Sequence, residues 1–363
     1  MIFNKIWQRY LLKETLKVFF LFLLCFFLLY ALIDYSMHMQ EILKNKKISW
    51  GDLSIYYGML FSKRCDLLLP LSLLISSVKV LTSLNKRNEL MAFQTAGIPL
   101  HHLTRPFFFV GIICVGLSYF NFEILAPKSL TYIDNFEKNY LKKKNKQKKD
   151  QTSVFAIPLE DGSRLVYQSY AKSEKEFLDV FWILSADEIY HMKTLKIDSP
   201  SPIGSYVDHM KRDREGKIVK VASHKTFQFT GLNLNSNLQE SYEHSIENRS
   251  ITQLAQMTLR KSPLFLENRT LIHTYLYFKV LMPWLPVLVL IGVIPFCVRS
   301  SRILPTFFIF SATIFGYIAF FTLMDGCVVL GEMRVVPPFW AIFTLPIAFF
   351  FIFGPRFIKM CVR

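Results

Sequence analysis

Cysteine is scarce in this sequence. Only six cysteines occur among 363 residues, and none lies between Lys128 and Thr270. No CxxC pair is present, so the cysteines are expected to be small core residues rather than metal ligands or redox pairs. The middle of the chain therefore cannot be cross-linked internally by disulfide bonds, whichever compartment holds it.

Motifs for nucleotide hydrolysis, metalloprotease chemistry and serine-hydrolase chemistry are absent. Nothing matches G-x-x-x-x-G-K-[ST], H-E-x-x-H or G-x-S-x-G. The adjacent His101 and His102 would point to different faces of a helix, which argues against a metal site. The sequence therefore predicts no catalytic residue, no metal and no cofactor. A membrane-anchored enzyme or a sensor with an outer β domain stays open as an alternative of another class.

Acidic residues are also few, with 27 Asp and Glu against 43 Lys and Arg, so the formal net charge is +16. Hydrophobic residues make up 52% of the chain and include 35 Phe, and the mean hydropathy is +0.29. This composition indicates a membrane protein. The basic excess fits the positive-inside rule and an anionic membrane surface, and no basic stripe interleaved with aromatic residues indicates nucleic acid.

Six apolar segments are long enough to cross a membrane. They are expected at about 18–33, 66–84, 107–125, 276–298, 303–324 and 337–353. Residues 1–17 carry a basic residue every four positions, which predicts a helix on the membrane surface that leads into the first segment. Prolines inside the fourth segment are tolerated in a membrane because neighbouring helices satisfy the freed carbonyl groups.

A large polar insert separates the third and fourth apolar segments. It opens with the basic run Lys142–Lys149, read as a solvated spacer, and then shows period-two patterns such as Ser163–Tyr167. Asp161-Gly162 and Glu215-Gly216 are typical of hairpin turns. The sequence predicts a membrane α-helical bundle, with three plus three transmembrane helices around an inserted all-β domain. The expected domains are residues 1–125, 126–270 and 271–363.

Basic residues indicate the orientation. The N-terminus, the 85–105 loop, the 299–302 turn and the C-terminus are all basic and fall on one side, which is therefore the cytoplasmic side. The loop after the first span is an exception, and we accept it because four elements agree. In this topology charged residues collect at the outer ends of spans one, two and five, where the basic ones can pair with lipid phosphates or simply anchor the interface. They are Asp34, Lys44, Lys46, Lys47, Lys63, Arg64 and Asp325.

A short helix is expected at about 88–97, between the second and third spans. Asn85 or Asn88 can cap its start, and Glu89 suits its first turn. Gly97 can close its end, and Leu90 and Phe93 share one face. A short helix with an apolar face and one acid, held at a membrane surface, is a candidate docking element. An ordinary connecting turn is the alternative.

These features resemble the lipopolysaccharide-export permeases of Gram-negative bacteria, the LptF/LptG or YjgP/YjgQ family. The similarity is carried by the opening run Arg9–Lys17, by Asn88–Gly97 and by the three-plus-three layout around an outer β domain. The run Asn88–Gly97 is the most specific of these and is similar to the glutamate-containing coupling helix of the family. The resemblance covers essentially the whole chain.

The resemblance implies a permease subunit of an ABC-type exporter. Such a subunit extracts lipopolysaccharide from the outer leaflet of the bacterial inner membrane and passes it to a periplasmic bridge. The implied partners are a homologous permease in a heterodimer, a dimer of a cytosolic ABC ATPase, and a single-span bridge protein. The β domain is expected to be a periplasmic jellyroll, and the lipid to enter laterally between spans one and five of opposite subunits. A permease for another lipid or glycolipid is the nearest alternative.

The resemblance also assigns residues. Glu89 matches the acidic docking residue of the family, and the same motif contains Leu90, Met91, Phe93 and Gly97. Some members carry a lysine near the outer end of the first span that contacts the lipid headgroup, whereas Asp34 occupies about that place here. The Lys142–Lys149 run is not a family feature. The opening resembles both the F-type and the G-type subunit.

Overall fold

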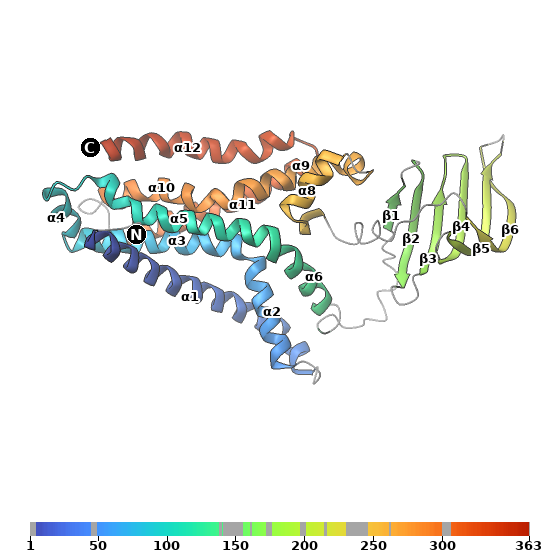
Figure 1. Cartoon of the computed structure of the whole chain (residues 1–363), viewed down its shortest axis with the longest axis horizontal. Helices are drawn as coiled ribbons and strands as arrows, with labels where there is room; N and C mark the ends of the chain where they lie inside the picture. The colour runs from blue at the N-terminus through green and yellow to red at the C-terminus, as the bar shows by residue number, and fades with distance from the viewer. Residues whose placement is uncertain are drawn as a thin grey trace. The chain divides into compact units, whose positions relative to one another are not determined.

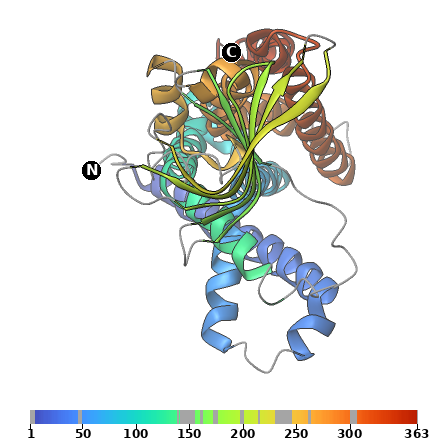
Figure 2. The same cartoon turned by 90° about the vertical axis from the view of Figure 1, so that its right-hand side faces the viewer.

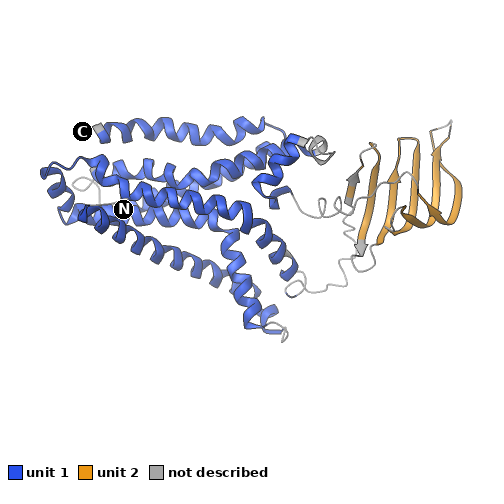
Figure 3. Ribbon diagram, viewed as in Figure 1, with its two compact units in different colours: residues 1–143, 246–259, 268–363 blue, residues 144–245, 260–267 orange. Residues whose placement is uncertain are grey.

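The computed structural model describes residues 5–44, 49–137, 140, 155–159, 162–171, 176–196, 201–213, 216–229, 246–260, 263–299 and 306–362. The chain divides into two compact units (Figure 3). The first comprises residues 1–143, 246–259 and 268–363, and the second comprises residues 144–245 and 260–267. Lys46, Lys47, Arg302 and the basic run 142–149 lie outside the described residues.

The first unit is helical (Figure 1). Its first half contains α1 (Ile6–Lys44), α2 (Trp50–Lys63), α3 (Cys65–Lys86), α4 (Glu89–Thr95), α5 (Leu100–Phe120), the π-helix η1 (Asn121–Leu125) and α6 (Ala126–Phe136). Its second half contains the 3-10 helix η3 (Ile246–Asn248), α8 (Ile251–Arg260), α9 (Pro263–Leu281), the 3-10 helix η4 (Met282–Trp284), α10 (Leu285–Arg299), α11 (Thr306–Glu332) and α12 (Pro338–Val362). Among the described residues, six helical stretches are long and apolar enough to cross a membrane, which confirms the predicted spans.

The first span differs from its prediction in length. A surface helix followed by a separate span ending at Asp34 was expected, but α1 is one continuous helix of 39 residues. The physical reason is that residues 6–44 contain neither proline nor glycine, so nothing in this stretch breaks the helix. The basic stripe and the first span are therefore parts of a single rigid element.

The fourth span is interrupted where prolines were noted. α9 ends at Leu281, η4 contains Pro283, and α10 continues from Leu285. The Tyr119 hydroxyl of α5 donates to the Val280 carbonyl at 2.7 Å and accepts from Trp284 Nε1 at 3.0 Å. A neighbouring helix thus contributes a hydrogen bond to a carbonyl group beside the break.

The centre of the bundle is α3. Of its apolar window 78% is buried, against 6% for α1 and 17% for α11. Ser72, Ser77 and Thr82 are buried in α3, and each hydroxyl donates to the carbonyl oxygen four residues earlier. Small side chains whose polar groups are satisfied within their own helix allow neighbouring helices to pack closely. α1 and α11 instead present apolar side chains outward.

The second unit contains an antiparallel sheet of six described strands in chain order, strongly twisted in Figure 2. The strands are β1 (Phe155–Pro158), β2 (Arg164–Ala171), β3 (Glu176–Ile183), β4 (Glu188–Lys196), β5 (Ile203–Arg212) and β6 (Ile218–Gln228). Gly162 and Gly216 have φ of +83° and +82° in the turns of the β1–β2 and β5–β6 hairpins. The inserted β domain and both hairpins with their glycines are therefore confirmed, whereas Asp161 and Glu215 lie outside the described residues.

The sheet bends along a line that crosses β3, β4 and β5 at Asp179, Lys193 and Tyr206, called here the crease. Asp179 and Tyr206 have φ of 51° and 52°, although neither is glycine. Lys193 lies between them on β4, and the regular pairing of β3 with β4 and of β4 with β5 skips this level. A left-handed residue in a strand bends it, so the crease folds the single sheet around its apolar core. That core includes Leu165, Phe177, Val180, Trp182, Met192, Leu195 and Val207.

Substitution at Asp179 tests whether the crease depends on backbone strain. We expect Asp179→Val to destabilise the sheet by at least about 1 kcal/mol more than Asp179→Gly, because a β-branched residue resists the left-handed conformation. Both variants lose the contact of Asp179 with His191 at 2.8 Å, so their difference isolates the backbone. Hydrogen exchange of the β3 and β4 amides measures it, and equal exchange in the two variants would contradict the interpretation.

Candidate functional site

The short helix predicted at 88–97 is present as α4. Its start differs from the sequence prediction, because Asn88 holds the capping position with φ of 58° but its side chain makes no capping hydrogen bond. The Asn85 side chain instead donates to the Cys297 carbonyl at 3.2 Å. Asn85 therefore joins the end of α3 to the end of α10 rather than capping α4.

The end of α4 follows the prediction. Gly97 has φ of +76°. The Ile98 amide donates to the Phe93 carbonyl at 3.1 Å, and the Gly97 amide donates to the Gln94 carbonyl at 3.0 Å. These two bonds form a Schellman motif, in which a glycine in the left-handed conformation closes a helix. α4 is thereby closed at Gly97, three positions before α5 begins.

α4 has a packed face and an open face. Leu90 is 4% exposed, and Phe93 packs against the Trp7 ring of α1 with a centroid separation of 6.0 Å. Met91 is 50% exposed. The Glu89 carboxylate lies 3.8 Å from Arg87 Nη1, in an exposed pair that contributes little stability. Glu89 and Met91 therefore leave an acid and an apolar side chain accessible on a helix anchored to the bundle.

The charged residues predicted at the outer ends of the spans divide into two groups. Asp34 is 7% exposed and lies beside the Tyr56 hydroxyl of α2, near His38 and Lys63. Lys44 is exposed at the end of α1. The structure therefore brings Asp34 and Lys63 together and leaves Lys44 open at the same end.

The second group surrounds Arg64, between α2 and α3. Its Nε donates to the Tyr30 hydroxyl of α1 at 3.1 Å, and its guanidinium lies 5.6 Å from the centre of that ring. Burial alone would lower the pKa of Arg64, but the Tyr30 hydroxyl and the carboxylates of Asp66 and Asp325 together raise it above its ordinary value. Arg64 is thus a cation that is bonded to Tyr30 of span one and attracted by the carboxylates of Asp66 in span two and Asp325 in span five.

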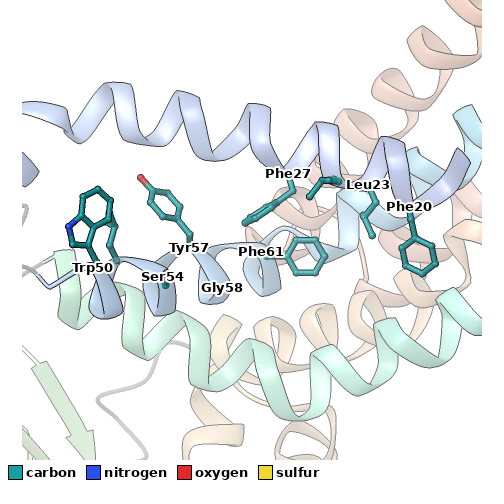
Figure 4. Close-up of a pocket in the computed structure, with 10 residues that line it drawn as sticks. Phe20, Leu23, Phe27, Trp50, Ser54, Tyr57, Gly58 and Phe61 are labelled. Carbon is teal, nitrogen blue, oxygen red and sulfur yellow. The ribbon is translucent and has the colours of Figure 1, made fainter. Parts of the chain in front are cut away.

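An apolar groove of about 710 Å³ runs between α1 and α2 (Figure 4). Phe20, Phe27, Trp50, Tyr57 and Phe61 line it together with smaller residues. Burial, with a further contribution from the carboxylate of Asp34, raises the pKa of the Tyr57 hydroxyl to about 12, so it stays neutral at neutral pH. The groove can therefore accept an uncharged hydrocarbon chain.

Sequence reasoning missed this groove because it treated residues 35–62 as a mixed loop. The local signal was present: Ser49 and Asp52 form a capping box at the start of α2, with Ser49 Oγ accepting from the Gly51 amide at 3.4 Å and Asp52 accepting from the Ser49 amide at 3.3 Å. The aromatic residues that follow then fall on faces of a helix.

A family model described as "Lipopolysaccharide export system permease LptF/LptG" matches residues 9–359, nearly the whole chain. The chain belongs to the LptF/LptG permease family. No curated protein matches it. Membership confirms the resemblance that the sequence carried and identifies the chain as a lipopolysaccharide-export permease.

An LptF/LptG permease with six membrane spans is a multi-pass protein of the inner membrane and works with other components of the export system. Among the described residues no group of three or more His, Cys, Asp or Glu side chains can hold a metal ion.

Substitution of Gly97 tests the rigid end of α4. We expect Gly97→Val to loosen α4 by about 1–2 kcal/mol, because valine is strained at φ of +76° although no atom lies within 4 Å of its Cβ position. Gly116→Ala in α5 is the matched control, since its Cβ also meets no atom within 4 Å and its backbone is helical. Hydrogen exchange of the α4 amides measures the effect, and unchanged exchange in Gly97→Val would refute it.

Proposed function

We propose that this permease converts ATP hydrolysis in a partner chain into extraction of lipopolysaccharide from the outer leaflet of the inner membrane. The observation that carries the proposal is α4, a short helix fixed at its end by Gly97 and anchored by Phe93 against Trp7. The chain has no nucleotide-binding motif of its own. The free energy of ATP hydrolysis is then transmitted to the permease through α4, the helix that a partner chain can bind.

The proposed ATPase-docking residues are Glu89, Leu90, Met91, Phe93 and Gly97. Their support is geometric, because α4 follows α3 after two residues and Gly97 precedes α5 by three. A displacement of α4 is therefore passed to two spans at once. Each CH₂ group of a lipid moved into water costs about 0.8 kcal/mol, so extraction needs such an energy input.

The proposed lipid path begins at α1. The outward apolar faces of α1 and α11 suit a homologous permease in a heterodimer, with the lipid entering between spans one and five of opposite subunits. The groove between α1 and α2 suits an acyl chain. Arg64, Lys63 and Lys44 are proposed as phosphate contacts. Lys46 and Lys47 lie outside the described residues and are proposed from the sequence alone. Asp34 is retained as a candidate for headgroup hydroxyls or amines.

The β domain, proposed as residues 126–270 with a jellyroll role, would receive the lipid and pass it to a periplasmic bridge protein. β6 supports this, because its residues are almost all exposed and include Ile218, Val219, Val221 and Phe227. Among the described strands β6 is the last in the sheet, and a strand edge with exposed apolar side chains is a template for a strand of another chain. We propose the sheet edge at β6 as the surface for that partner.

The proposed orientation places both termini and α4 on the cytoplasmic side. In Figure 1 the two ends of the helical unit and α4 lie at the same end of the bundle, as a six-span chain requires. The basic residues of that end agree with the positive-inside rule. The outer ends of the spans, with Arg64 and the α1–α2 groove, then face the periplasm.

A permease for another lipid or glycolipid is the second candidate. The observation that favours it is the groove lining, which is almost entirely apolar. Such a lining can bind a hydrocarbon chain but does not select a particular headgroup. The lipid that copurifies with the complex distinguishes the two candidates. A docked ATPase with a different bound lipid would support the second.

Glu89→Ala tests the docking role of α4. We expect the variant to bind the ATPase roughly ten- to a hundredfold more weakly, because a hydrogen bond to a charged group contributes about 1.5–3 kcal/mol. The fold should be preserved, since the Glu89 side chain is 32% exposed and makes only a surface ion pair. Copurification of the ATPase with the tagged permease measures the loss.

Gln94→Ala is the matched control, because Gln94 is exposed on the same helix and only its backbone carbonyl bonds in the cap. It should bind the ATPase as the natural chain does. Equal copurification with Glu89→Ala and with the natural chain would remove Glu89 from the docking site.

A further inference from the structure

The segment that returns from the sheet to the bundle contacts two spans. β6 ends at Gln228, and after Phe229 the described chain resumes at η3 and α8. The chain then continues through α9 into the fourth span. Because the β domain is an insert, only the outgoing chain after α6 and this return segment connect it to the helices. Motion carried along the return path passes through residues 246–260.

Lys279, on the fourth span, holds the start of this segment. Its Nζ donates to the Glu247 carbonyl at 2.6 Å and to the Arg249 carbonyl at 2.5 Å, and the residue is 5% exposed. The carboxylates of Glu247 and Glu123 are close enough to attract the ammonium group. A buried ammonium group is unfavourable unless it is hydrogen-bonded and paired, so Lys279 requires the return segment to be in place.

Glu123, at the end of the third span, holds the start of α8. It accepts from the Thr252 amide at 3.2 Å and also from the Thr252 hydroxyl. A carboxylate suits this position because the first amides of a helix carry a partial positive charge. Glu123 lies in η1, and short π-helical turns of this kind frequently occur at functional sites.

The same π-helical turn is bonded to α2 on its other side. Ser62 Oγ donates to Asn121 Oδ1 at 2.6 Å, and Asn121 Nδ2 donates to the Ser62 carbonyl at 3.0 Å. Both residues are buried. Asn121, Glu123, Thr252 and Lys279 therefore form one set of contacts, called here the return node, which joins α2, the third span, α8 and the fourth span.

We infer that Glu123 and Lys279 are positioning residues, which make the return segment move with spans three and four. Under the proposed function, on which this inference rests, movement of the spans then displaces the chain that leads to the β domain in the same step. If the node is broken, the partner still hydrolyses ATP and the spans still move. The lipid, however, is passed on less often for each ATP consumed.

Lys279→Met tests the inference in the full-length chain, assembled with its partner chains and reconstituted in vesicles containing lipopolysaccharide. Two quantities are measured: lipid released per ATP hydrolysed, and hydrogen exchange of amides 246–256. We expect at least a fivefold drop in lipid per ATP, ATP hydrolysis within twofold of the natural complex, and faster exchange confined to the return segment. Lys279→Arg keeps the charge and donors, and should restore both quantities.

Thr252→Val is a milder second variant, because it removes the hydroxyl bonded to Glu123 and leaves the amide. It should shift both quantities in the same direction by a smaller factor. Thr258→Val on the same helix is the matched control, since the Thr258 hydroxyl bonds only to the Leu254 carbonyl within α8. If Lys279→Met does not fold, the same two quantities measured in Thr252→Val and Glu123→Gln test the inference.

Two results would overturn the inference. Faster exchange with unchanged lipid per ATP would make the node a local structural contact only. A parallel loss of ATP hydrolysis and lipid release, not restored by Lys279→Arg, would show a general defect of assembly. A natural complex that releases no lipid with ATP would instead refute the proposed function, so the two failures are distinguishable.

Discussion

Close packing around α3 is the constraint on which the rest of the helical unit depends. Its small buried hydroxyl residues bond within the helix, so α1, α10 and α11 can pack tightly against it. α4 follows α3 after Arg87 and Asn88 and is held by Phe93 against Trp7. Because α3 is packed on most of its surface, we propose that a displacement of α4 by a docked partner is passed through α3 to the neighbouring spans.

In the proposed orientation Arg64 lies at the outer end of the bundle, where such displacement can be used. Arg64 donates to Tyr30 of α1 and is attracted by the carboxylates of Asp66 in α3 and Asp325 in α11. An apolar groove runs between α1 and α2. The return node links the third and fourth spans to the chain that comes back from the sheet. α2 takes part in both, because it lines the groove with α1 and is bonded to the return node through Ser62 and Asn121.

Much of the fold could be predicted from sequence, because membrane spans and hairpins have strong local signals. Six apolar runs were enough to predict the helical bundle, and period-two patterns with two glycine turns were enough to predict the inserted sheet. The length of α1 was wrong because charged residues were taken to end a helix that nothing interrupts. The crease at Asp179 and Tyr206, the Asn85 bond to α10 and the return node depend on contacts far apart in sequence. No local pattern encodes them. In α4 the sequence predicted the helix and its glycine end, whereas the exposure of Glu89 and Met91 required the structure.

The most direct test of the central proposal is affinity purification of the natural chain in mild detergent, followed by mass spectrometry of the proteins and lipids bound to it. The proposed function predicts a soluble ABC-type ATPase, a homologous permease and lipopolysaccharide in one complex. Recovery of the chain alone, or as a homodimer without an ATPase, would contradict a coupling role for α4 and would leave it an ordinary connection between two spans.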